Sequence, residues 1–215
     1  MGALKEETLE NFTAALASSA PVPGGGGVSA LVGALAVSLG SMTASLTVGK
    51  KRYADVEDRM KEMISDAEEL RSRLLGLIDE DAEGFSNLME VMKMPRTTEE
   101  ERSAREFAMD GALKMSGMVP LKIMRSAADV IDLLEEIADK GSRAVLSDAG
   151  CGASLARSAM ECAALNVYAN TKYMKDREAA KKMNTEVIDL LDESLPLAED
   201  IYKKAGRELT EQIRG

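Results

Sequence analysis

The chain has 215 residues, of which 45% are hydrophobic, and this is enough to form one domain with a sizeable core. The formal net charge of −10 argues against a nucleic-acid-binding protein, because contact with phosphate groups requires a basic face. The sequence contains no histidine, which excludes Ser–His and Cys–His nucleophilic sites and leaves acid–base chemistry to other side chains.

Helical periodicity accounts for almost the whole sequence. Aromatic residues make up only 3%, and a core of Ala, Leu, Met and Gly suits closely packed helices better than a sheet. In chain order, helices are predicted over residues 6–18, 27–48, 54–93, 99–139, 149–174 and 176–212. Pro120 predicts a kink or a break in the fourth of these, and Pro196 predicts a bend in the last. We therefore predict a single all-α domain over residues 1–215, built as an up-and-down bundle of long antiparallel helices.

Short signals mark where some of these helices begin and end. Thr98, followed by Glu101, forms a capping-box signature at the start of the fourth helix. Gly141 is placed as the stop of that helix. Ser147 or Asp148 is predicted to cap the helix that follows.

An uncharged stretch from Gly24 to Gly49 permits several interpretations. It is long enough to span a membrane, but scattered Ser and Thr residues and two internal glycines argue against a span. A phosphate loop fails because "GKK" at 49–51 lacks the leading glycine and the final hydroxyl of that motif, and a dinucleotide fingerprint fails because no strand precedes it. We expect a helix buried on all sides in a soluble cytoplasmic protein. Four glycines ahead of it leave backbone N–H groups free for an anionic or carbonyl-bearing ligand.

One carboxylate lies on an apolar face, in the segment "LIDEDAEGF" at 77–85. At about 100° per residue, Asp81 falls between Ile78 and Phe85 within the apolar stripe, whereas Asp79 falls on the charged face. A carboxylate inside a bundle is costly unless it has a partner. It either forms a buried salt bridge with a Lys or Arg of another helix, or it is an acid–base group whose pKa is raised by desolvation beside a pocket. The pattern leaves both explanations open.

Two amides interrupt the small-residue helix predicted over 149–174. Asn166 and Asn170 are four residues apart and share one face of that helix. Directed inward, they could hydrogen-bond the edge of a heterocycle. The alternative, which the pattern favours slightly, is hydrogen bonding between helices or simple exposure to solvent.

The ordered set of segments resembles one family. The segments are "PVPGGGGVSALVGALAVSLGSMTASLT", "GKKRY", "IDEDAEGF" with "KMP" shortly after, "VPL" at 119–121 and "SDAGCGASLARSAMECAALNV". Together they resemble the cyclodeaminase/cyclohydrolase family, which comprises the C-terminal domain of formiminotransferase-cyclodeaminase and its stand-alone microbial relatives. The chain departs from the family pattern at Gly27, where a serine is usual, and at Gly84, where the D-x-x-A-F motif has alanine.

The resemblance implies an all-helical fold, at least a homodimer, and activity on one-carbon forms of tetrahydrofolate. We expect conversion of 5-formiminotetrahydrofolate to 5,10-methenyltetrahydrofolate and ammonia. The alternative is a methenyltetrahydrofolate cyclohydrolase, which opens that ring with water to give 10-formyltetrahydrofolate. A non-catalytic folate-binding protein is a further alternative. No permanently bound cofactor, metal, nucleic acid or membrane is expected, and the folate is the substrate.

The resemblance also implies roles for individual residues. The acidic catalytic residue of the family corresponds to Asp81, with Lys51 or Asp148 as electrostatic partners. The substrate-binding residues are expected to be Pro23, Gly24, Gly25, Gly26, Ser41, Lys50, Lys51, Asp148 and Asn166. The glycines would approach the pterin or the benzoyl-glutamate portion of the folate. The basic run from Lys50 to Arg52 is either a solvated helix end or a site for the glutamate tail.

Overall fold

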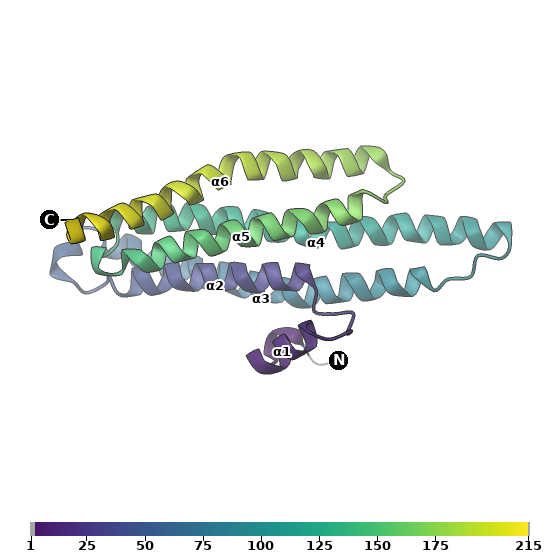
Figure 1. The fold of residues 1–215 in the computed structure, drawn as a ribbon, viewed down its shortest axis with the longest axis horizontal. Coiled ribbons are helices and arrows are strands. Elements are labelled where there is room, and N and C mark those ends of the chain that lie inside the picture. The colour runs from purple at the N-terminus through teal and green to yellow at the C-terminus, as the bar shows by residue number, and fades with distance from the viewer. Residues whose placement is uncertain (1–2, 215) are drawn as a thin grey trace.

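The computed structural model describes residues 3–214, with side chains up to Glu211, as a bundle of long helices (Figure 1). The helices are α1 (Leu9–Leu16), α2 (Gly25–Ser45), α3 (Glu57–Met92), α4 (Glu99–Lys140), α5 (Leu146–Thr171) and α6 (Arg177–Arg214). Short 3-10 turns are η1 (Leu4–Glu6), η2 (Lys51–Tyr53) and η3 (Arg143–Val145). From α2 to α6 each helix runs antiparallel to the one before it (Figure 1). No strand occurs within residues 3–214, so the predicted all-α fold is confirmed for this range.

The helix ends agree with the sequence signals in part. The capping box is present, with the backbone N–H of Glu101 donating to Thr98 Oγ1 at 3.1 Å. The same helix ends at Lys140, and Gly141 follows because a Cβ there would lie only 2.5 Å from the carbonyl oxygen of Ile137. The predicted cap of the next helix is wrong. Because η3 leads directly into α5 at Leu146, Ser147 and Asp148 fall inside its first turn, and no side chain caps it.

Both internal prolines are accommodated within continuous helices. α4 passes through Pro120, so the break that the sequence allowed does not occur, and α6 passes through Pro196. α6 bends along its length (Figure 1). Pro120 is buried against neighbouring helices, and this packing offsets the loss of one backbone hydrogen bond.

α2 packs against α3, α4 and α5. It is the one helix among the described residues that is long and apolar enough to cross a membrane, but most of it is buried inside the bundle. Within one chain the expectation that it is covered on all sides is wrong, because Leu35 and Met42 are 48% and 40% exposed, and Leu46, its C-cap, is 45% exposed. The homodimer that such a face would suit stays a prediction.

Close helix packing leads to a first testable prediction, at Gly152 of α5. A Cβ at this position would lie 3.0 Å from the carbonyl oxygen of Ala36 and 3.0 Å from Leu134 Cδ2. Gly152→Val should therefore lower the free energy of unfolding by about 1–3 kcal/mol, measured by urea titration. Gly76→Ala is the matched control, since a Cβ there meets no atom within 4 Å and should not destabilise the helix. Equal stability of the Gly152→Val variant and the wild type would contradict this account of the packing.

Candidate active site

The N-terminus of α2 meets the carboxylate of Asp81 on α3. The helix begins at Gly25, with Gly24 as its N-cap, so the glycines form its first turn instead of a turn ahead of it. The first backbone N–H groups of a helix have no acceptor within it. Gly27 N–H donates to Asp81 Oδ2 at 2.9 Å. Asp81 therefore caps α2 from a neighbouring helix.

The contact between Asp81 and α2 depends on the absence of a side chain at Gly26. A Cβ on Gly26 would lie 2.0 Å from Asp81 Oδ1, so no other residue fits without moving the carboxylate. Gly27 differs, because a Cβ there would meet Ile78 and Pro23 at an ordinary 3.7 Å. The space therefore does not exclude the serine that is usual at position 27 in the family the sequence resembles. Pro23 itself is buried, and the Val22–Pro23 peptide bond is cis.

The charge on Asp81 is not balanced by another side chain. Asp81 is half-buried, and this desolvation raises the pKa of its carboxyl, while the hydrogen bond from Gly27 N–H acts in the opposite direction. No Lys or Arg among the described side chains forms an ion pair with it. The buried salt bridge is therefore wrong as an explanation of Asp81. The acid–base interpretation is the one that agrees with its surroundings.

A cavity of about 140 Å³ opens in front of Asp81. Its walls come from four parts of the chain, namely the Pro21–Gly26 segment, Asp81 and Phe85 of α3, Ser116 of α4, and Asn166 and Asn170 of α5. Three predicted glycines, Asp81 and Asn166 are thus brought together, while Pro23 lies behind the wall. A small, partly polar cavity beside a desolvated carboxylate is a typical candidate for an active site.

The amides and the hydroxyl in this cavity are held by their own helices or by a neighbour. Asn166 Nδ2 donates to the carbonyl oxygen of Cys162 at 2.9 Å, and Asn170 Nδ2 donates to that of Asn166 at 2.8 Å. Each amide keeps its Oδ1 as an acceptor. Ser116 Oγ donates to the carbonyl oxygen of Gly84 at 2.9 Å. Ser116 was not predicted, although a small polar residue one helical turn before a proline is a detectable signal.

Four predicted site residues lie at the other end of the bundle. Ser41 is 15 residues beyond Gly26 on α2, which is about 22 Å along the axis. Lys50 and Lys51 follow that helix, and Asp148 opens the antiparallel α5 at the same end (Figure 1). Lys50 Nζ donates to Ser142 Oγ at 2.8 Å. Within one chain, the prediction that Lys51 or Asp148 is an electrostatic partner of Asp81 is therefore wrong.

Asp79 also differs from its predicted surroundings. It points away from the cavity, as the helical wheel indicated, but it is half-buried instead of fully solvated. Its Oδ1 accepts the backbone N–H of Leu4 at 2.7 Å, and its Oδ2 lies 3.5 Å from Lys5 Nζ. Asp79 thus fastens the N-terminal turn η1 to α3.

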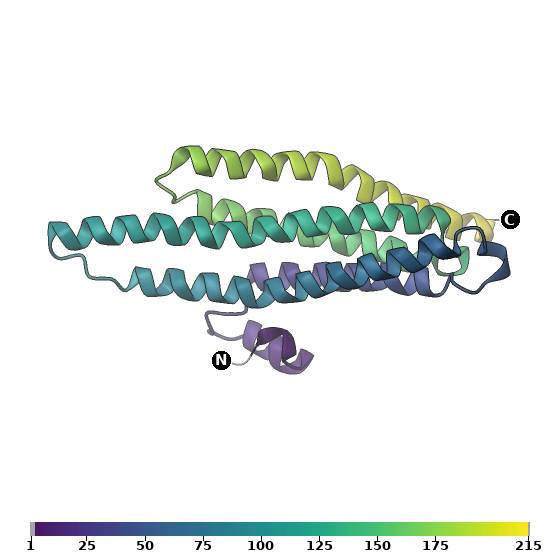
Figure 2. The same cartoon turned by 180° about the vertical axis from the view of Figure 1, so that it is seen from behind.

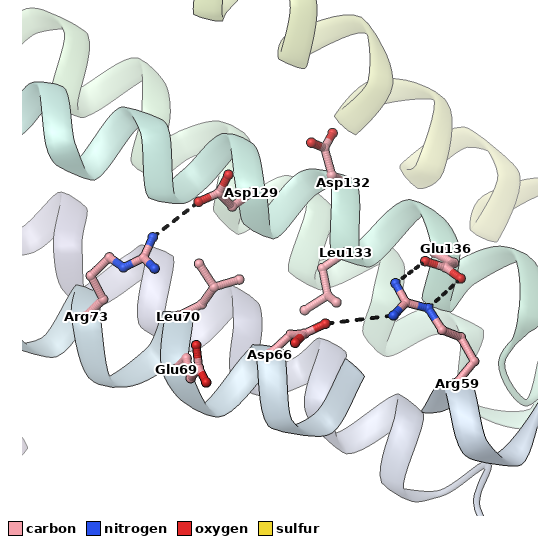
Figure 3. A pocket seen from close by; sticks show the side chains of 9 residues that line it. All are labelled: Arg59, Asp66, Glu69, Leu70, Arg73, Asp129, Asp132, Leu133 and Glu136. Atoms are coloured by element: carbon pink, nitrogen blue, oxygen red, sulfur yellow. Dashed lines mark hydrogen bonds and ion pairs between the residues drawn. The ribbon is translucent and has the colours of Figure 1, made fainter. Parts of the chain in front are cut away.

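A second hollow, between α3 and α4, holds an ion-pair network (Figure 3). Arg59 binds both carboxylate oxygens of Glu136, and its hydrogen bonds lower the pKa of Glu136 to about 2. Arg73 pairs with Asp129 at 3.3 Å. The two cations of this hollow are thus already paired. Over the described ranges, no group of three or more His, Cys, Asp or Glu residues is placed to hold a metal ion.

Comparison with known proteins identifies the family to which the chain is similar. The sequence model of the formiminotransferase-cyclodeaminase family matches residues 8–189. A methenyltetrahydrofolate cyclohydrolase from Methylorubrum extorquens is 44% identical over 197 residues, which are 92% of this chain and 95% of that protein. Formimidoyltransferase-cyclodeaminase from Mus musculus is 30% identical over 191 residues. This match covers 89% of the chain but only 35% of the mouse protein, so the chain spans about a third of that relative's length.

A solved structure has the same fold. The crystal structure of formiminotetrahydrofolate cyclodeaminase from Thermotoga maritima aligns with a TM-score of 0.81 at 30% sequence identity. The alignment covers 98% of this chain and 99% of the other. The two chains therefore share the helical fold over nearly their whole lengths.

Proposed function

The chain belongs to the formiminotransferase-cyclodeaminase family of folate one-carbon enzymes, and on this premise we propose that it is a methenyltetrahydrofolate cyclohydrolase. The observation that carries the proposal is the similarity to the M. extorquens cyclohydrolase over nearly the full length of both proteins. The deaminase activity expected from the sequence becomes the second candidate. The proposed reaction converts 5,10-methenyltetrahydrofolate and water into 10-formyltetrahydrofolate and a proton.

In this reaction Asp81 acts first as a base and then as an acid. Its carboxylate takes a proton from water as the water oxygen bonds to the methenyl carbon, giving a neutral carbinolamine. The protonated Asp81 then returns its proton to N5 of the folate as the bond between N5 and that carbon breaks. The carbinol oxygen loses its proton as the formyl group forms, so one proton is released overall. A carboxyl whose pKa is raised by desolvation suits both transfers.

The electrostatics of the cavity support a cationic substrate. The methenyl group carries a positive charge shared between its carbon and two nitrogens. Asp81 has no ion-pair partner among the side chains described, so the substrate can supply the opposite charge. The Oδ1 atoms of Asn166 and Asn170 line the same cavity and can accept hydrogen bonds from the N–H groups of the pterin.

The second candidate is formiminotetrahydrofolate cyclodeaminase, and the name of the T. maritima relative favours it. N10 of the folate would attack the protonated formimino carbon and give its proton to Asp81. N10 attack closes the ring, and Asp81 would then protonate the amino group, which leaves as ammonia as the double bond of the methenyl group forms. The same carboxylate therefore serves either reaction, although the nucleophile and the leaving group differ.

Kinetics with both substrates test the proposal. We expect the purified chain to hydrolyse 5,10-methenyltetrahydrofolate, followed by its absorbance, with a kcat/KM at least tenfold higher than for 5-formiminotetrahydrofolate, since a factor of ten requires only about 1.4 kcal/mol of difference in transition-state binding. The enzyme-free rate of each reaction is subtracted as a control. A higher kcat/KM with 5-formiminotetrahydrofolate, accompanied by release of ammonia, would replace the proposed function by the second candidate.

A further inference from the structure

The cavity at Asp81 is too small for a whole folate. It holds about 140 Å³, whereas sites for ligands of this size are usually about 300–1,000 Å³. A second cavity of about 570 Å³ shares Phe85, Asn166 and Asn170 with it. We call this second cavity the apolar groove. The rest of its wall consists of Leu88, Met92, Met109, Leu113, Ala169 and Tyr173. The two cavities together have the volume that one such ligand requires.

The apolar groove exists because α2 starts late relative to its neighbours. α2 begins at Gly25, next to Asp81 and Asn166, whereas α3, α4 and α5 continue past this level (Figure 2). No part of α2 covers them beyond that point. Apolar side chains therefore remain open to solvent, with Met92 53% exposed and Tyr173 66% exposed. Such a patch beside a polar cavity is typical of a ligand site.

Two cations lie beside residues that line the apolar groove, and neither forms an ion pair within the described residues. Lys172 Nζ lies 5.4 Å from the centre of the Tyr173 ring. Arg105 Nη2 donates to the carbonyl oxygen of Met92 at 3.4 Å, and Arg105 Nε is buried without a hydrogen-bond partner among the described residues. The adjacent acid Glu106 is paired with Lys175 instead. The charges of Arg105 and Lys172 are therefore not compensated by an ion pair among the described residues, so an anionic ligand can supply the opposite charge.

The order of polarity along this surface matches the order of groups in a folate. The acidic, amide-bearing cavity comes first and then the apolar groove, with Lys172 beside Tyr173 in the groove wall and Arg105 beside Met92 at its far end. From Asp81 to Met92 is 11 residues of α3, or about 16 Å, a length that an aminobenzoyl ring followed by a glutamyl group can follow. We infer that the apolar groove binds the aminobenzoyl ring, and that Arg105 and Lys172 bind the glutamate carboxylates. This inference rests on the proposed function and assigns the tail to a site other than Lys50–Arg52.

The test compares 5,10-methenyltetrahydrofolate with 5,10-methenyltetrahydropteroate, which lacks the glutamate. Arg105→Gln combined with Lys172→Gln should raise KM for the first substrate about tenfold, leave KM for the second unchanged, and change kcat little. The combined variant Lys50→Gln and Lys51→Gln is the matched control and should keep the wild-type preference for the glutamate-bearing substrate. Tyr173→Ala should raise KM for both substrates, because it removes part of the groove wall itself.

The outcomes separate this inference from the proposed function. If the wild type acts only on 5-formiminotetrahydrofolate, the same comparison is made with that substrate and its pteroate analogue, so the inference is tested although the hydrolase proposal has failed. If the Arg105 and Lys172 variant keeps the full preference for glutamate, the assignment of the tail is overturned. Loss of the preference in the Lys50 and Lys51 variant would instead place the tail at the other end of the bundle. Circular dichroism checks that each variant is folded.

Discussion

Replacing Asp81 by Asn is expected to lower kcat by a factor of about 10²–10⁴ while the bundle stays folded. Asn has the same shape, and its Oδ1 can still accept the 2.9 Å hydrogen bond from Gly27 N–H, but the amide cannot take a proton from water. Initial rates with 5,10-methenyltetrahydrofolate and a circular dichroism spectrum measure the two effects. Full activity of the variant would eliminate Asp81 as the catalyst.

The same residue sets the expected pH dependence. The ionised carboxylate is the base, and burial raises its pKa, so kcat/KM should rise with pH through a midpoint above the usual range of an aspartate and then level off. The Asp81→Asn variant should lose this dependence. A wild-type profile that is flat across this range, after subtraction of the enzyme-free reaction, would show that another group acts as the base.

The stability of the Asp81→Asn variant distinguishes a catalytic from a structural role. Because the folded-state pKa is raised, the folded protein binds the proton more tightly than the unfolded chain does. This contribution to stability is present at low pH and is lost as the pH rises through the folded pKa. The variant should therefore melt at or above the wild-type temperature at neutral pH, and this difference should disappear in acid. A large loss of stability at neutral pH would indicate a structural carboxylate.

Gly26→Ala should also reduce activity strongly, by about 10²-fold, because its Cβ would occupy the space of Asp81 Oδ1. The added methyl group would lie 2.0 Å from that oxygen, so the carboxylate must turn away from the cavity. The fold should survive, since the atoms that must move belong to the end of a side chain and Ala favours a helix over Gly. The measurement is kcat/KM, with Gly76→Ala on α3 as the control that should keep the wild-type rate.

A double variant tests whether Gly26 acts through Asp81. If it does, adding Gly26→Ala to Asp81→Asn should cost far less than it costs in the wild type, because the two residues affect one group. If the double variant instead loses activity by the product of the two separate factors, Gly26 contributes to catalysis in some other way.

Helical periodicity predicted that Asp81 faces inward, because the direction of this side chain depends on one helix alone. Its spacing from Ile78 and Phe85 is a local property of the sequence, and a helix of 36 residues preserves it. The contact with Gly27 could not be predicted in this way, because it depends on the level at which α2 begins beside α3. The same limit explains why Phe85 and Ser116 were missed as parts of the cavity wall.

The position of the basic residues could not be predicted from the sequence. Lys50 and Lys51 were assigned to the site from the family resemblance and their charge, but α2 separates them from the glycines by its 21 residues, or about 30 Å. Helical periodicity also gives no information about contacts with distant segments, such as the hydrogen bond from the backbone N–H of Leu4 to Asp79. The limits of α4 and its Thr98 capping box were predictable because they depend on neighbouring residues only.

Because α3 and α4 extend beyond the start of α2, the proposed chemistry and the binding of the folate tail depend on different parts of the bundle. Asp81 lies where α2 begins, so the proposed chemistry takes place at a level that the far end of the hairpin does not touch. Each additional turn of α3 and α4 would lengthen the hairpin by about 5.4 Å without repacking the residues around Asp81. Relatives could thus adapt to folates with longer or shorter polyglutamate chains by changing hairpin length alone.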